Sequence, residues 1–127
     1  MKKIISTENA PKAVGPYSQA IEANGTLYIS GQIPVNPADG TIGETIEEQT
    51  HQCLKNVGAI LEEAGYTYAD VVKSTVLLDD MDNFGAMNAI YASYYTSDLP
   101  ARVCYQVAKL PLGVKVEIET IAVSSCR

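Results

Sequence analysis

Three charged side chains interrupt apolar segments near the end of the sequence, where core strands would otherwise be expected. Arg102 opens the segment RVCYQVA, and Glu117 and Glu119 lie within VKVEIETIAV. A guanidinium offers a rigid fork of donors that matches a carboxylate through two parallel hydrogen bonds. Arg102 therefore suggests a clamp for the carboxylate of a small organic acid, and its alternative is a structural salt bridge. For Glu117, the alternative to a functional role is an exposed strand carboxylate.

Whether Arg102 and Glu117 share one face depends on the connection between their segments, which we expect to form a hairpin around Leu110–Gly113. A four-residue loop would place Cys104 opposite Glu117. A loop of three or five residues would send the two sets to opposite faces, because a slip of one residue inverts every side chain of a strand. The sequence leaves both registers open.

Histidine and cysteine content limits the nucleophilic chemistry that the chain can perform. There is one histidine, His51, in a segment expected to be helical, and the cysteines are Cys53, Cys104 and Cys126. An odd number of cysteines without CxxC spacing indicates reduced thiols and a cytoplasmic protein. Cys104 stands beside an arginine, but no Cys/His pair can be argued for it, and no metal site is expected.

Composition narrows the class of protein further. The 127 residues suffice for one domain with a real core, 46% of them are hydrophobic, and the net charge is -6. Binding to nucleic acid usually begins with a basic patch, whereas the nine Lys and Arg residues are scattered. No segment resembles a signal peptide or a membrane span, so we expect no membrane association.

The periodicity predicts strands first, then a helix, a strand, a second helix and two strands. Apolar residues recur at three and four over Thr45–Ala64, where Thr45 and Glu48 form a capping box and Gly65 fits the C-terminal stop. Asp82 is expected to cap the second helix.

The strand DVVKSTVLL alternates, which assigns Val72, Ser74, Val76 and Leu78 to one face. This order of elements predicts a two-layer α/β domain with both helices on one face of a mixed sheet. The strands carry apolar residues on both faces, so we expect self-association to cover the other face.

Three motifs carry a resemblance to a known family. GPYSQAI at 15–21, YISGQIPVNP at 28–37 and PARVCYQVAKLPLGVKVEIETIAV at 100–123 resemble the RidA family, also called YjgF, the enamine/imine deaminases. The resemblance covers essentially the whole chain and implies a single RidA-like domain over 1–127. It implies a chorismate-mutase-like fold and a homotrimer with clefts between neighbouring subunits. It also implies hydrolysis of 2-aminoacrylate and 2-aminocrotonate, as imines, to 2-oxo acids and ammonia, with no metal or organic cofactor.

The resemblance also assigns roles to residues. Arg102 matches the arginine that binds the substrate carboxylate, and Glu117 matches the glutamate that holds the attacking water. The other matched residues line the cleft or approach the substrate: Tyr17, Ser30, Gly31, Asn88 and Cys104. Val103 replaces a serine found in many members, and the segment 94–102 is shorter than in some relatives.

Two other functions stay open beside the deaminase. The family has also been described as an endoribonuclease or translation inhibitor, although the net charge of -6 and the single histidine argue against it. A chaperone-like protein that binds carboxylates without turnover would keep Arg102 but would not need Glu117.

Overall fold

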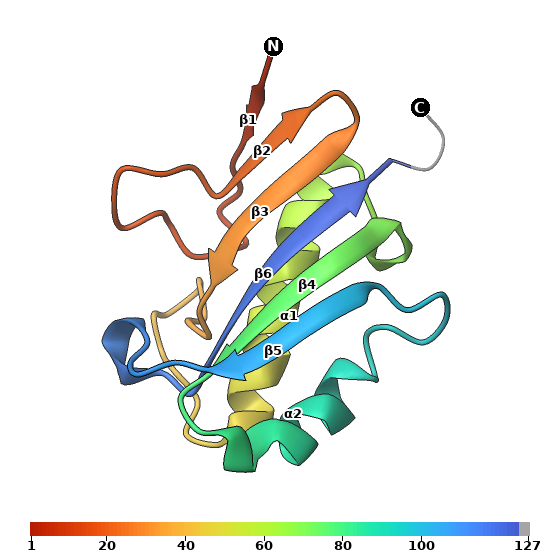
Figure 1. The fold of residues 1–127 in the computed structure, drawn as a ribbon. Coiled ribbons are helices and arrows are strands. Elements are labelled where there is room, and N and C mark those ends of the chain that lie inside the picture. Colours follow the sequence, from red (N-terminus) through yellow and green to blue (C-terminus); the bar gives the residue numbers. More distant parts are fainter. Residues whose placement is uncertain (125–127) are drawn as a thin grey trace.

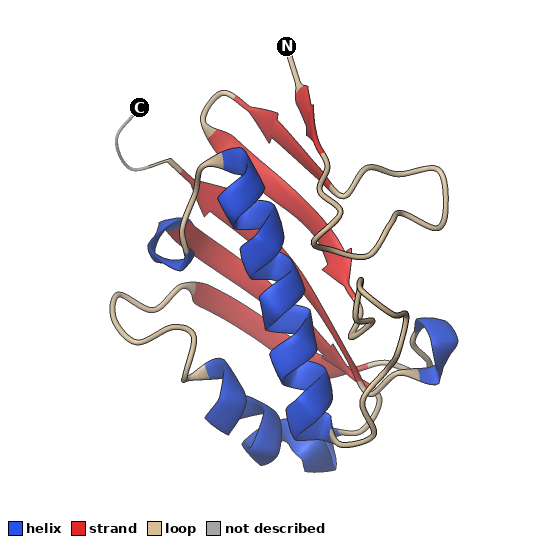
Figure 2. Ribbon diagram, turned by 180° about the vertical axis from the view of Figure 1, so that it is seen from behind, coloured by secondary structure: helices blue, strands red, loops and turns tan. Residues whose placement is uncertain are grey.

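The computed structural model describes residues 1–124, so Cys126 lies outside the described residues. Two α-helices and six strands follow the predicted order: β1 Lys3–Ile5, β2 Ala20–Ala23, β3 Thr26–Gln32, α1 Ile46–Ala64, β4 Val71–Leu78, α2 Phe84–Tyr91, β5 Ala101–Gln106 and β6 Val116–Val123. The strands form one sheet in the order β1-β2-β3-β6-β4-β5. Only the pairing of β4 with β5 is parallel within this sheet, which is therefore mixed. Both helices cover the same face (Figures 1 and 2), which confirms the two-layer prediction.

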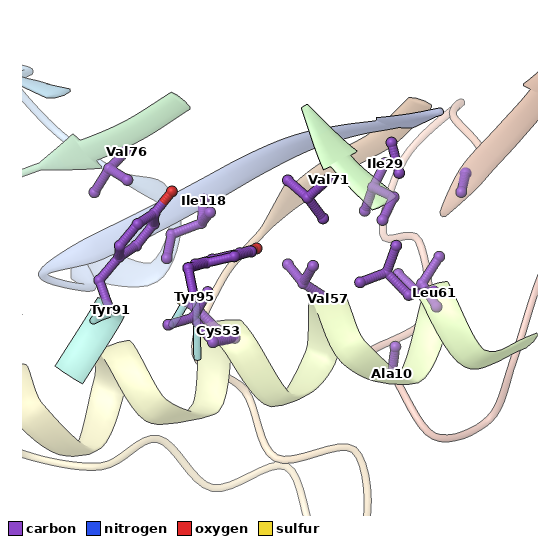
Figure 3. Close-up of a cluster of buried hydrophobic side chains, with 14 of the residues drawn as sticks. Ala10, Ile29, Cys53, Val57, Leu61, Val71, Val76, Tyr91, Tyr95 and Ile118 are labelled. Atoms are coloured by element: carbon purple, nitrogen blue, oxygen red, sulfur yellow. The ribbon is translucent and has the colours of Figure 1, made fainter. Parts of the chain in front are cut away.

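Helix α1 begins and ends where the sequence signals place it. The Thr45 side chain accepts a hydrogen bond from the Glu48 backbone at 3.1 Å, and the Glu48 carboxylate accepts one from the Thr45 backbone at 3.1 Å. Gly65 ends the helix with φ of 81°, a left-handed conformation that suits glycine. The buried side of α1, including Cys53, Val57 and Leu61, packs under the sheet (Figure 3).

The expected hairpin between β5 and β6 is wrong, because β4 lies between these two strands. The unit β4–α2–β5 is a parallel crossover, and its helix returns the chain to the free side of β4. The segment 107–115 then passes the end of β4 to reach its other side. At this end, Val107 N–H donates to the Leu78 carbonyl at 2.9 Å, and Asp79 N–H donates to the Lys115 carbonyl at 3.1 Å.

Two finer predictions around β4 also need correction. Asp82 is not the cap that the sequence predicts. The cap is Asp80, which precedes the turn Met81–Asn83 before α2 and whose side chain accepts a hydrogen bond from Asp82 N–H at 2.9 Å. Val72 does not share the buried face, because the pairing with β6 shifts register between Val71 and Lys73. This irregularity buries Val71 and leaves Val72 exposed.

The face of the sheet opposite the helices is partly apolar and uncovered in the single chain. Tyr28, Val103 and Tyr105 belong to this face by strand alternation, and each keeps 40–49% of its surface exposed. Exposed apolar side chains gathered on one face usually mark an interaction surface.

Candidate active site

Arg102 lies on β5, at the edge of the sheet, and its side chain turns toward the helix layer. The guanidinium donates through Nη1 to Asn88 Oδ1 at 2.7 Å, and its Cζ lies 4.9 Å from the centre of the Tyr91 ring. Among residues 1–124, no carboxylate forms a salt bridge with it. The structural salt bridge is therefore absent from this part of the chain, and donors of the half-buried guanidinium stay available to a ligand.

Cys104 lies two residues beyond Arg102 and on the same side of β5. Partial burial raises the pKa of its thiol, and the neighbouring Arg102 charge only partly opposes this effect. The single histidine, His51, lies in α1 and places its Nδ1 2.9 Å from Tyr94 Oη. A protonated thiol without a histidine partner is a poor nucleophile, so Cys104 is better suited to lining a site than to attacking a substrate.

Glu117 lies on β6, in the centre of the sheet, with its half-buried side chain on the face opposite the helices. Burial raises the pKa of its carboxyl, and the negative charge of Glu119 raises it further. A carboxyl whose pKa moves toward neutrality can both accept and return a proton near physiological pH. The general-base role that the resemblance assigns to Glu117 stays a prediction, and the raised pKa of the carboxyl is the property that this role requires.

Gly31 provides the space that the Glu117 side chain occupies. The pairing of β3 with β6 shifts register between Ile29 and Gln32, which forms a bulge that contains Ser30 and Gly31. A Cβ atom built on Gly31 would lie 3.0 Å from Glu117 Cδ, and Oε2 would be closer still. The structure thus brings Gly31 and Glu117 into direct contact.

Ser30 belongs to this bulge in β3, and Tyr17 lies in the loop that joins β1 to β2. The Ser30 hydroxyl donates to the Ser18 carbonyl at 2.6 Å, so it holds the loop rather than pointing freely to a ligand. Tyr17 is 50% exposed, and its hydroxyl accepts a hydrogen bond from Val14 N–H at 3.3 Å. Tyr17 and Gly31 both line a largely apolar hollow of about 660 Å³.

The predicted residues fall into two groups on opposite faces of the sheet. Arg102 pairs with Ser74, which is buried beneath the helices, whereas Glu117 pairs with Leu77, which faces the other way. Asn88 and Cys104 accompany the arginine, and the loop and bulge residues accompany the glutamate. The faces of Arg102 and Glu117 are therefore set by how β5 and β6 each pair with β4. A single chain does not bring the two groups into one pocket.

Sequence reasoning missed residues that hold these groups in place. Phe84 and Tyr91 contact the Arg102 guanidinium. They lie four residues before and three residues after Asn88, a spacing that indicates one shared face of a helix. Gln19 is buried and donates from Nε2 to the carbonyls of Thr7 at 3.0 Å and Pro11 at 2.8 Å. A glutamine among small and apolar residues was a weak signal for this anchor of the Tyr17 loop.

Two further properties concern the described residues as a whole. Within residues 1–124, no three His, Cys, Asp or Glu side chains converge as metal ligands would. No helix in the same range is long and apolar enough to cross a membrane.

Known proteins resemble this chain over nearly its full length. The profile of the family described as endoribonuclease L-PSP matches residues 7–124. A mouse protein named 2-iminobutanoate/2-iminopropanoate deaminase is 53% identical over 125 residues, which are 97% of this chain and 92% of the mouse protein.

Two solved structures show the same fold. YyfA of the Rid protein family, from Yersinia pestis, is 50% identical, with a TM-score of 0.94 and coverage of 97% of this chain and 99% of that one. TdcF from E. coli, solved with bound serine, is 42% identical, with the same TM-score and the same coverage. The chain therefore belongs to the endoribonuclease L-PSP family, the RidA family that its motifs resemble.

Proposed function

We propose that this protein is a 2-iminobutanoate/2-iminopropanoate deaminase, which hydrolyses reactive 2-imino acids to 2-oxo acids and ammonia. The observation that carries the proposal is the state of Arg102. Its guanidinium is held by the neutral amide of Asn88 and, within residues 1–124, has no carboxylate partner of its own. An arginine kept in this way is ready for the carboxylate of a small acid. The name of the mouse relative and the serine bound to TdcF agree with such a ligand.

The residues support a simple hydrolysis. Arg102 would bind the substrate carboxylate and hold the imine carbon in place. Glu117 would orient a water molecule for attack on that carbon and take one of its protons. The carbinolamine then collapses: Glu117 gives its proton to the amino nitrogen and takes up the hydroxyl proton as the carbon–nitrogen bond breaks and the carbon–oxygen double bond forms. The 2-oxo acid and ammonia leave, and the ammonia carries the remaining proton away as ammonium. A protonated imine is already electrophilic, so this reaction needs no strong nucleophile.

We further propose that the complete site forms between two copies of the chain, in a homotrimer. Arg102 and Glu117 lie on opposite faces of one sheet, so one chain cannot present both to the same small molecule. The uncovered apolar face that carries Glu117 provides a surface on which another copy can pack. A neighbour that brings its own β5 edge to the Gly31 bulge would complete the cleft.

The direct test is Arg102→Ala, assayed with 2-iminobutanoate generated freshly by a threonine dehydratase. Two charge-assisted hydrogen bonds contribute about 3–6 kcal/mol, so we expect kcat/KM to fall by about 10²–10⁴-fold. Lys109→Ala is the matched control, because it removes an exposed cation outside the site. Ammonia release at the wild-type rate by a folded Arg102→Ala protein would refute the clamp.

An endoribonuclease is the second candidate, because the matching family carries that description. Cleavage of a defined RNA by the purified protein, lost in Glu117→Gln, would support it. The same ammonia assay separates the deaminase from a protein that only binds carboxylates. Glu117→Ala should abolish turnover in a deaminase, whereas a binding protein would show no turnover even as wild type.

A further inference from the structure

Helix α2 presents three side chains to the Arg102 guanidinium. Asn88 accepts its hydrogen bond at 2.7 Å, and the ring centres of Phe84 and Tyr91 lie 5.6 Å and 4.9 Å from its Cζ. These three residues are spaced by four and three positions, which places them on one face of the helix. Both ring distances fall within the range in which a cation is attracted to an aromatic face.

These contacts restrict a side chain that is otherwise very mobile. Arginine loses much rotamer entropy when a ligand fixes it, and this loss weakens binding. The Asn88 bond fixes one nitrogen, while the aromatic contacts limit where the planar group can lie. A guanidinium that is already held can bind a carboxylate with a smaller entropic cost.

Tyr91 is itself held in place by the buried residues that pack against its ring. It is 7% exposed, and its ring centre lies 4.7 Å from that of Tyr95 (Figure 3). Ser74, which pairs with Arg102 across β4 and β5, is likewise buried. Burial raises the pKa of Tyr91 more than the Arg102 charge lowers it, so the phenol stays neutral and does not neutralise the guanidinium.

We propose that Tyr91, assisted by Phe84, is a positioning residue that presents the Arg102 guanidinium to the substrate carboxylate. The proposal rests on the function proposed above, in which Arg102 is the carboxylate clamp. The alternative is that Tyr91 only fills the core. The two differ in what they require, because positioning needs an aromatic face beside the cation, whereas filling the core needs only apolar volume.

The test compares Tyr91→Phe and Tyr91→Leu by their affinity for 2-oxobutanoate, measured by calorimetry on the intact oligomer. Tyr91→Phe keeps the aromatic face and should bind within about twofold of wild type. Tyr91→Leu should raise Kd by about 3- to 30-fold, the size of a partly desolvated cation–π contact. In the ammonia assay, the same variant should raise KM more than it lowers kcat.

Tyr66→Leu is the control, because Tyr66 is also buried, at 3% exposed, but lies beyond the end of α1 and belongs to neither group of site residues. It should lower thermal stability and leave Kd unchanged. Wild-type affinity in Tyr91→Leu, or an equal loss in Tyr66→Leu, would overturn the proposal. If Tyr91→Leu does not fold, Phe84→Leu at the half-buried end of α2 provides the same comparison.

The binding measurement also separates this proposal from the function on which it rests. A wild type that binds 2-oxobutanoate without releasing ammonia would refute the deaminase and leave the positioning role of Tyr91 in place. A wild type that does not bind 2-oxobutanoate would overturn both.

Discussion

Mixing two inactive variants tests whether the site is shared between copies. Arg102→Ala removes the clamp but keeps Glu117, and Glu117→Ala does the reverse. In a cyclic oligomer, each cleft would take its arginine from one copy and its glutamate from the next. A cleft in a random equimolar mixture is intact only when both contributors carry the needed residue, so about one quarter of the wild-type activity should return.

The assay co-expresses the two variants with different tags and measures ammonia release from 2-iminobutanoate. In the proposed trimer, purification through both tags keeps only mixed assemblies, each with one intact cleft, so about one third of the wild-type activity is expected. Arg102→Ala carrying both tags is the control and should stay at background. Background activity in mixed oligomers that are shown to have assembled would refute the shared site, because it would mean that both groups act from one chain.

Two further predictions concern the surroundings of Glu117. Gly31→Ala should lower kcat/KM by about 10- to 100-fold, because the new methyl group displaces the Glu117 carboxylate. Gly85→Ala is the control and should keep the wild-type kcat/KM, because a Cβ at Gly85 has nothing within 4 Å. Equal kcat/KM values for the two variants would contradict the contact between Gly31 and Glu117. Glu119→Gln removes a charge that raises the Glu117 pKa, so the acid limb of the kcat/KM profile, which rises as Glu117 loses its proton, should move to lower pH. Glu44→Gln, which removes an exposed carboxylate elsewhere, is the control and should leave the acid limb in place. If the acid limb of Glu119→Gln stays at the wild-type pH, the effect of Glu119 on the Glu117 pKa is contradicted.

Features encoded by neighbouring residues could be predicted from the sequence. The capping box of Thr45 and Glu48 and the stop at Gly65 were correct because each depends on backbone geometry within one helical turn. The order of helices and strands was correct for the same reason, since hydrophobic period is a local property.

Features that depend on the choice of partner strand could not be predicted in the same way. The break at Leu110–Gly113 is typical of a hairpin turn, but β5 had already paired with β4 through α2. The β6 strand therefore completed the other side of β4, and the relative faces of Arg102 and Glu117 followed from two separate registers. Likewise, the bulge at Val71–Lys73 shifts Val72 out of the core without any local signal.

The position of the charged groups also explains why apolar strands carry them. Arg102 can lie on the helix side because α2 supplies aromatic rings and a neutral amide instead of a carboxylate. Glu117 can lie on the opposite face because the bulge at Gly31 gives its side chain room. Each group is only half-buried in one chain, so neither incurs the full cost of desolvation before assembly. Packing another copy against the uncovered face would remove more water from Glu117, which raises the pKa of its carboxyl, whereas the Arg102 guanidinium that the copy brings to the cleft acts in the opposite direction. Assembly would then complete the site around a carboxylate that each chain already holds in place.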